Sequence, residues 1–310
     1  MTRQQGVRPS PLFWAIVALT AVGGALAWYT GSEPTPLAYA GVFVFVIAGW
    51  TVSLCLHEFG HAYTAWRYGD QDVELRGYLT LNPLKYSNPL LSLGLPALFI
   101  ALGGIGLPGG AVYVRTWFMN ARQRTLVSLA GPAANVVLAV LLLVGTTLLF
   151  DQNHGVFWSG LAFLGFLQVT AVLLNLLPIP GLDGYNALEP HLSPDTQRAL
   201  QPAKQWGFLI LMVLLIAPAL NQMFFSLVYF FVRLAGVPPH LAMIGGADYL
   251  LGLADPAVPA DLTATIHTFT DGLRAIAVNA LAGVSNEDPA QAGRLRDTQA
   301  AGDRITELCK

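Results

Sequence analysis

Long apolar runs dominate the pattern of hydrophobic and polar positions along the chain. Four runs are long enough to cross a bilayer as a helix: Pro11–Tyr29 and residues 36–68, 125–150 and 156–177. A fifth run, residues 206–234, contains Pro218 and Asn221 and predicts either one kinked span or one span followed by an interfacial piece. The pattern predicts a polytopic α-helical membrane protein with a core of about four to six transmembrane helices.

Two segments after the second run have a different pattern. Residues 72–86 are polar with alternating apolar positions, and this alternation predicts a short strand, as does the sequence of residues 111–114. Residues 90–107 are apolar but rich in Gly and Pro. A full crossing there would place three later arginines outside, against the positive-inside tendency, so we expect a short re-entrant or β-hairpin segment. Such strands would offer an edge to an extended peptide.

Composition supports a membrane protein. Of the 310 residues, 54% are hydrophobic and 11% are charged, whereas soluble domains carry about 25% charged residues. The net charge of -2 implies no basic surface for nucleic acid. Two cysteines, Cys55 and Cys309, are too few and too far apart for a disulfide framework, and we expect Cys55 to be a packing residue.

The composition also suggests three regions. Residues 1–35 hold an N-terminal tail and the first span, residues 36–236 hold the main membrane core, and residues 237–310 form a soluble helical or partly disordered tail. Arg3 and Arg8 precede the first span and predict a cytoplasmic N-terminus. We therefore expect a multi-pass protein of the cell membrane whose second span returns to the cytoplasmic face.

The strongest candidate for chemistry lies near the end of that second run. His57, Glu58 and His61 form an H-E-x-x-H motif. On a helix the two histidines share one face and can bind zinc, and Glu58 can act as general base. Chance is the competing explanation, but ionisable side chains in an apolar run are costly and by default functional. We therefore expect a metal site near the cytoplasmic face.

A catalytic zinc site needs a third protein ligand. Asp183 is the strongest candidate, because it follows the fourth run and a proline-broken segment that should return it to the depth of His57. Three rivals in more polar sequence remain open: Glu74, Glu189 and His191. The remaining histidines are expected on the wrong side or in the tail: His154, His240 and His267.

Two asparagines lie in apolar helices. Asn135 opens the third span and Asn175 closes the fourth. An interhelical hydrogen bond is the simpler interpretation of each. The alternative is a donor that positions a substrate carbonyl group.

Together these motifs resemble the site-2 proteases, the M50 intramembrane zinc metalloproteases. The resemblance covers residues 42–188 and rests on the H-E-x-x-H motif, on Gly131-Pro132-Ala133-Ala134-Asn135, on Asn175-x-x-Pro178 leading to Asp183-Gly184, and on residues 81–86. No PDZ-like insertion separates the zinc helix from Asp183, which suggests a bacterial type without that domain.

The resemblance implies a function and a site. It implies one zinc ion per chain on His57, His61 and Asp183, with Glu58 as the catalytic base. It implies cleavage of a peptide bond in or near the transmembrane helix of a single-span substrate, for example an anti-sigma factor or a membrane-tethered regulator. It also implies that Asn135 and Asn175 lie near the site and orient the substrate.

Two other classes of function compete with this one. A catalytically inactive zinc-binding protein that binds transmembrane partners would look similar, although the presence of Glu58 favours an enzyme. A transporter or channel should carry ionisable residues along several spans, whereas here they gather at one depth.

Overall fold

The computed structural model describes residues 6–86, 112–253 and 259–308, and within these ranges the regular structure is entirely helical. The α-helices are α1 (Pro11–Tyr29), α2 (Pro36–Arg67), α3 (Asp72–Leu75), α4 (Pro83–Tyr86), α6 (Ala121–Leu149), α7 (Gly155–Asn175), α8 (Asp183–Leu188), α9 (Pro194–Leu200), α10 (Gly207–Ile216), α11 (Pro218–Leu234), α12 (Pro239–Leu253), α13 (Ala260–Leu281) and α14 (Pro289–Leu308). Short 3₁₀ helices are η1 (Tyr78–Thr80), η3 (Gln152–His154), η4 (Glu189–His191) and η5 (Gln201–Trp206).

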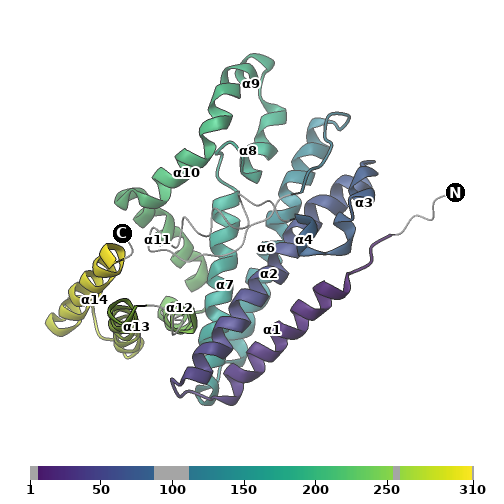
Figure 1. Cartoon of the computed structure of the whole chain (residues 1–310). Coiled ribbons are helices and arrows are strands. Elements are labelled where there is room, and N and C mark those ends of the chain that lie inside the picture. Colours follow the sequence, from purple (N-terminus) through teal and green to yellow (C-terminus); the bar gives the residue numbers. More distant parts are fainter. Residues whose placement is uncertain (1–5, 87–111, 254–258, 309–310) are drawn as a thin grey trace.

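Four of the described helical segments are long and apolar enough to cross a membrane: α1, α2, α6, and η3 together with α7. The number rises to six if each of two bent helix pairs forms one span. These results confirm the expected polytopic helical membrane protein. Figure 1 shows α2 between α1 and the antiparallel pair of α6 and α7.

Three of the membrane-spanning helices, α1, α2 and α6, start where the sequence provides a side-chain cap. Ser10 accepts a hydrogen bond from the backbone N–H of Phe13, and Pro11 occupies the first turn of α1. Thr35 caps α2 in the same way. Asn120 and Gln123 form a reciprocal capping box at the start of α6. These polar caps explain why the helix starts could be placed closely from the sequence.

The strand expected at residues 72–86 is wrong. The chain there forms α3, η1 and α4, and it turns at Gly77 and Leu81, whose φ angles are +77° and +55°. These left-handed positions cannot belong to an extended strand. Val73 of α3 and Leu79 of η1 are both buried against α2. The alternating apolar positions therefore reflect packing of short helical turns on α2. Residues 112–114 form no strand either, within the described chain. Residues 90–107 lie outside the described residues.

The fifth apolar run is broken where the sequence has Pro218. Ala217 is extended between α10 and α11, and α11 then meets α12 at an angle of 113°. α12 belongs to the packed core: Tyr249 is fully buried and contacts Phe43 of α2 and Phe163 of α7. The core therefore continues beyond residue 237, where the sequence suggested that the tail begins.

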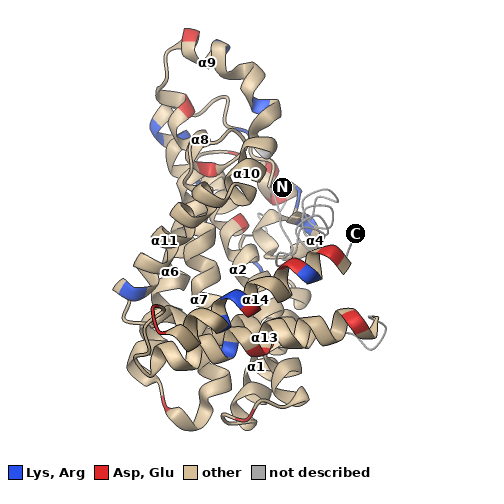
Figure 2. Ribbon diagram, turned by 90° about the vertical axis from the view of Figure 1, so that its left-hand side faces the viewer, with Lys and Arg blue, Asp and Glu red and all other residues tan. Residues whose placement is uncertain are grey.

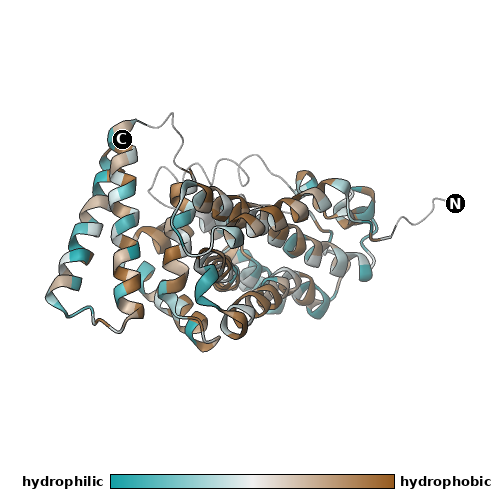
Figure 3. Ribbon diagram, turned by 90° about the horizontal axis from the view of Figure 1, so that it is seen from below, coloured by the Kyte–Doolittle hydropathy of each residue, from teal (hydrophilic) through white to brown (hydrophobic). Residues whose placement is uncertain are grey.

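α13 and α14 form an antiparallel hairpin beside this core. Seen from below, the hairpin lies at one edge of the molecule and carries more hydrophilic residues than the spans do (Figure 3). Charged side chains are sparse along the spans and more frequent on this hairpin and around α8 and α9 (Figure 2). The hairpin is therefore helical, whereas the solubility of the tail stays a prediction.

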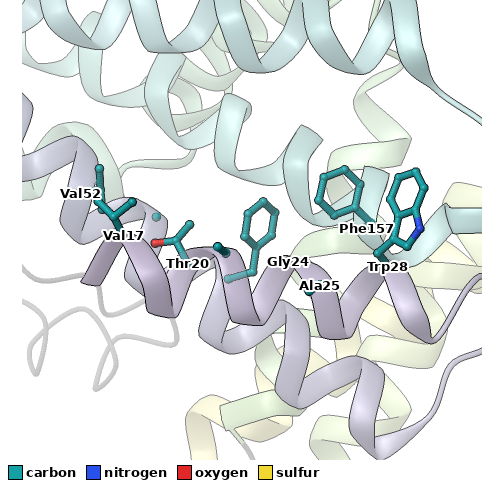
Figure 4. Close-up of a pocket in the computed structure, with 10 residues that line it drawn as sticks. Val17, Thr20, Gly24, Ala25, Trp28, Val52 and Phe157 are labelled. Atoms are coloured by element: carbon teal, nitrogen blue, oxygen red, sulfur yellow. The ribbon is translucent and has the colours of Figure 1, made fainter. Parts of the chain in front are cut away.

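An apolar groove of about 530 Å³ lies between α1, α2 and α7. Small residues such as Thr20 and Gly24 line its middle, Trp28 and Phe157 line one end, and Val17 lines the other (Figure 4). None of the candidate zinc ligands lines it. The groove is therefore distinct from the candidate metal centre.

Candidate metal centre

Two of the candidate ligands lie on the face of α2 that α6 crosses closely. His57 and His61 lie one turn apart near the end of α2, and both are buried. α6 crosses α2 at this point, with Gly60 against the backbone oxygen of Ala130. A Cβ atom on Gly131 would collide with the Nε2 atom of His61 and lie 2.6 Å from that of His57. The small residues of α6 thus leave a space into which both imidazoles point.

Asp183 enters the same space from the first turn of α8. Its Oδ2 atom lies 3.3 Å from Nε2 of His57 and 3.4 Å from Nε2 of His61. Gly184 makes this approach possible, because a Cβ atom there would meet the backbone oxygens of Leu176 and Leu177. Residues far apart in the sequence therefore meet at one point.

The protonation of His61 follows from its partner. Its Nδ1 atom lies 2.7 Å from the backbone oxygen of Val127, which can only accept a hydrogen bond. In the neutral imidazole, the form that binds a metal, the proton therefore lies on Nδ1 and Nε2 presents a lone pair. His57 has the same arrangement, with its Nδ1 hydrogen-bonded to Oδ1 of Asn135.

Three electron-pair donors therefore converge. The two Nε2 atoms are 3.1 Å apart, and each lies 3.3–3.4 Å from Oδ2 of Asp183. Tetrahedral zinc with ligand bonds of 2.0–2.1 Å would hold its ligands about 3.3 Å apart. Oδ2 of Asp183 is buried and has no hydrogen-bond partner within the described chain. These observations fit a zinc site with three protein ligands.

The charge state of Asp183 suits a ligand. Burial raises its pKa, but the imidazolium forms of His57 and His61, which donate to this carboxylate and carry a positive charge, outweigh this effect and lower the pKa to about 2. The carboxylate is therefore ionised at neutral pH, as metal binding requires.

Glu58 is buried beside the three ligands without belonging to their cluster. It is 4% exposed, and it is close enough to His57, His61 and Asp183 to interact with each of them electrostatically. The backbone of Val112 hydrogen-bonds to its carboxylate. A buried carboxylate next to a metal site, and free of the metal ligand cluster, is suited to proton transfer.

The rival ligands lie elsewhere. Glu189 pairs with Lys204 at 2.6 Å, and His191 hydrogen-bonds to Thr125 at 2.8 Å. Neither they nor Glu74 joins the cluster of candidate metal ligands among the described residues. His154 pairs with Asp151 in the loop before α7. His240 and His267 lie on α12 and α13.

The two asparagines differ. Asn135 is buried and touches His57 directly, which makes it an interhelical hydrogen-bonding residue that also contacts the site. Asn175 is the half-buried last residue of α7, and its side chain forms no hydrogen bond within the described chain. Gln168, which was not expected at the site from the sequence, hydrogen-bonds to Asn135. Its isolated polar side chain in the fourth apolar run was a usable signal.

Comparison with known proteins places this site in a family. No family model matches the chain, and no solved structure matches it. A protein of Mycolicibacterium smegmatis named as a zinc metalloprotease, Rip2, is 69% identical over 243 residues, which are 78% of this chain and 94% of the relative. The Rip2 protein of Mycobacterium tuberculosis is 67% identical over the same shares. YwhC of Bacillus subtilis, also named as a zinc metalloprotease, is 34% identical over 54% of this chain and 78% of its own length. The chain therefore belongs to the family of zinc metalloproteases that includes the mycobacterial Rip2 proteins.

Proposed function

We propose that this protein is an intramembrane zinc metalloprotease of the site-2 type, in the M50 group and without a PDZ domain. It hydrolyses a peptide bond in or near the transmembrane helix of a single-span membrane protein. The observation that carries the proposal is the position of the site. His57, His61 and Glu58 are buried and Asp183 is half-buried among apolar helices, near the end of a helix long enough to span a membrane.

Each site residue has a chemical task in this proposal. His57, His61 and Asp183 hold one zinc ion, which polarises a carbonyl group and lowers the pKa of water when bound. The Glu58 carboxylate accepts a proton from the attacking water and later gives it to the amine of the leaving peptide. The substrate helix must unwind locally, because a helical backbone keeps its carbonyl groups hydrogen-bonded.

The orientation is also part of the proposal. Arginines before α1 favour a cytoplasmic N-terminus, and in this orientation α2 returns with His57 and His61 near the cytoplasmic face of the cell membrane. An anti-sigma factor or another membrane-tethered regulator is a fitting substrate, because cleavage near this face would release its cytoplasmic part.

The test of catalysis compares the protein with its Glu58→Gln variant. Both are purified in detergent, zinc is quantified by mass spectrometry, and a panel of single-span peptides is assayed for cleavage. We expect about one zinc per chain in both proteins, in line with a three-ligand site, and cleavage by the unmodified protein alone. Equal cleavage by both proteins would refute the role of Glu58.

The alternative function is that of a catalytically inactive zinc-binding protein that binds transmembrane partners. Zinc in both proteins with cleavage by neither would favour it. The burial of Glu58 beside the ligands supports the enzyme, because an unused buried carboxylate carries a large desolvation cost.

The third ligand can be tested separately. Loss of a residue that hydrogen-bonds to a metal ligand typically lowers metal affinity roughly 10–100-fold. Asp183→Ala removes a ligand itself and should lower zinc affinity by more than this. His191→Ala is the matched control, since His191 hydrogen-bonds to Thr125 and lies outside the cluster. Chelator competition measures both affinities. Loss of zinc from His191→Ala, with zinc retained in Asp183→Ala, would show that His191 and not Asp183 is the third ligand.

A further inference from the structure

A chain of buried polar side chains leads away from the metal centre. Nδ2 of Asn135 on α6 donates to Oε1 of Gln168 on α7 at 2.7 Å. Nε2 of Gln168 donates to Oγ of Ser53 on α2 at 2.9 Å, and Ser53 donates to the backbone oxygen of Trp50 at 2.7 Å. Asn135, Gln168 and Ser53 are 3%, 0% and 4% exposed. This relay, Asn135–Gln168–Ser53, therefore joins three helices away from water.

The far end of the relay determines its direction. The Trp50 carbonyl can only accept, so the single hydroxyl proton of Ser53 is used there and Ser53 must accept from the Gln168 amide nitrogen. The Gln168 oxygen then faces Asn135 and requires its nitrogen. The Asn135 oxygen is left facing His57 and can only accept from Nδ1. Each amide orientation follows from the one before it.

This direction matters at the metal centre. A proton held on Nδ1 of His57 leaves Nε2 with a lone pair, directed at His61 and Asp183. If the Asn135 amide turned round, its nitrogen would require an acceptor at Nδ1. The proton would then move to Nε2, where it would block metal binding.

We propose that Gln168 and Ser53 are positioning residues of the metal centre. They lock the Asn135 amide in the orientation that keeps His57 protonated at Nδ1 and able to bind zinc through Nε2. The proposal rests on the zinc site described above. Gln168 and Ser53 act through Asn135, because neither residue touches the donor atoms of the metal ligands. The competing explanation is that the relay only holds the helices together.

The test measures zinc affinity by chelator competition and, separately, the unfolding temperature with excess chelator. Gln168→Met keeps an unbranched side chain and removes the hydrogen bonds, so zinc affinity should fall about 10–100-fold. Ser53→Ala should shift it in the same direction. Gln168→Glu should restore it, because a protonated carboxyl group donates to Ser53 and accepts from Asn135 in the same order as glutamine.

Ser159→Ala is the matched control for Ser53→Ala. Ser159 is fully buried on α7, and its hydroxyl donates to the backbone oxygen of Val156 at 2.9 Å, outside the relay. Both variants should lower the unfolding temperature of the metal-free protein, but only Ser53→Ala should weaken zinc binding.

Unchanged zinc affinity in Gln168→Met and Ser53→Ala, with a lower unfolding temperature, would overturn the proposal and leave the zinc site standing. Absence of zinc from the unmodified protein in the same titration would overturn both. If Gln168→Met fails to fold, Ser53→Ala and Gln168→Glu still decide the question.

Discussion

Gly131 shows how a residue without a side chain shapes the metal centre. It lies in the first half of α6, opposite the two imidazoles, and a Cβ atom there would occupy the space between their Nε2 atoms. Small residues at a helix crossing generally serve close packing. The structure gives the more specific reason that they leave room for a bound ion.

Gly131→Ala should therefore abolish zinc binding while the helix remains intact. The new methyl group contacts ligand nitrogens held by buried hydrogen bonds to Val127 and Asn135, so the imidazoles cannot move aside freely. Zinc content after purification measures the effect. Gly145→Ala on the same helix is the control, because its Cβ would meet no atom within 4 Å.

The control should retain zinc and gain about 0.5–1 kcal/mol of stability from the lower entropy cost of alanine in a helix. Equal zinc content in both variants would show that the space at Gly131 is not needed for the metal.

At the scale of elements, α12 is the helix for which the expectation from the sequence differs most from the structure, because it belongs to the core and not to the tail. It follows a sharp bend after α11, yet it packs across α2 and α7. Gly245 allows this contact, because a Cβ atom there would collide with the backbone oxygen of Ser159 and lie 2.9 Å from Cβ of Phe163. Backbone atoms cannot yield as a flexible side chain can, so this contact requires glycine.

Gly245→Val should destabilise the protein by at least the 1–3 kcal/mol typical of overpacking. Gly293→Val is the control on α14, where nothing lies within 4 Å of the added Cβ atom and the helix-propensity change is the same. Unfolding temperatures in detergent compare the two. Similar values would show that α12 is not part of the packed core.

At the scale of the whole molecule, the two ends of α2 carry different parts of the protein. His57 lies 18 residues after Tyr39, which corresponds to about 27 Å along a helix. Arg274 of α13 hydrogen-bonds to the Tyr39 hydroxyl at 3.1 Å and pairs with the buried Asp248 of α12. The α13–α14 hairpin is therefore fixed near the end of α2 that is distant from the metal centre, as the relative positions of α8 and α13 in Figure 1 also show.

If the metal centre lies near the cytoplasmic face, this hairpin should lie on the outer side. A cysteine at the exposed Asp297 of α14, in a Cys309→Ser background, should react with a membrane-impermeant maleimide in intact cells. A cysteine at Arg198 on α9 should react only after the cells are opened. Cys55 is buried and should not react with the maleimide in either condition. The opposite labelling pattern would invert the proposed orientation.

The sequence by itself determined the long helices and half of the metal centre. Apolar runs with Ser, Thr or Asn caps define α1, α2 and α6, because a span must satisfy its own backbone within the bilayer. His57, Glu58 and His61 share one helix, so their mutual geometry follows from the helical period. Asp183 required either a resemblance to a family or a choice among rivals, since its approach depends on the turn after α7.

Only the tertiary structure decided which distant groups meet. Residues 72–86 alternate like a strand, but packing against α2 and two left-handed positions make them a series of helical turns. The convergence of Asp183 on the histidines, the space at Gly131 and the relay through Gln168 all depend on crossings between helices. The period of a helix fixes neighbours three or four residues apart, whereas contacts between helices depend on the backbone approach that glycines and buried polar groups allow.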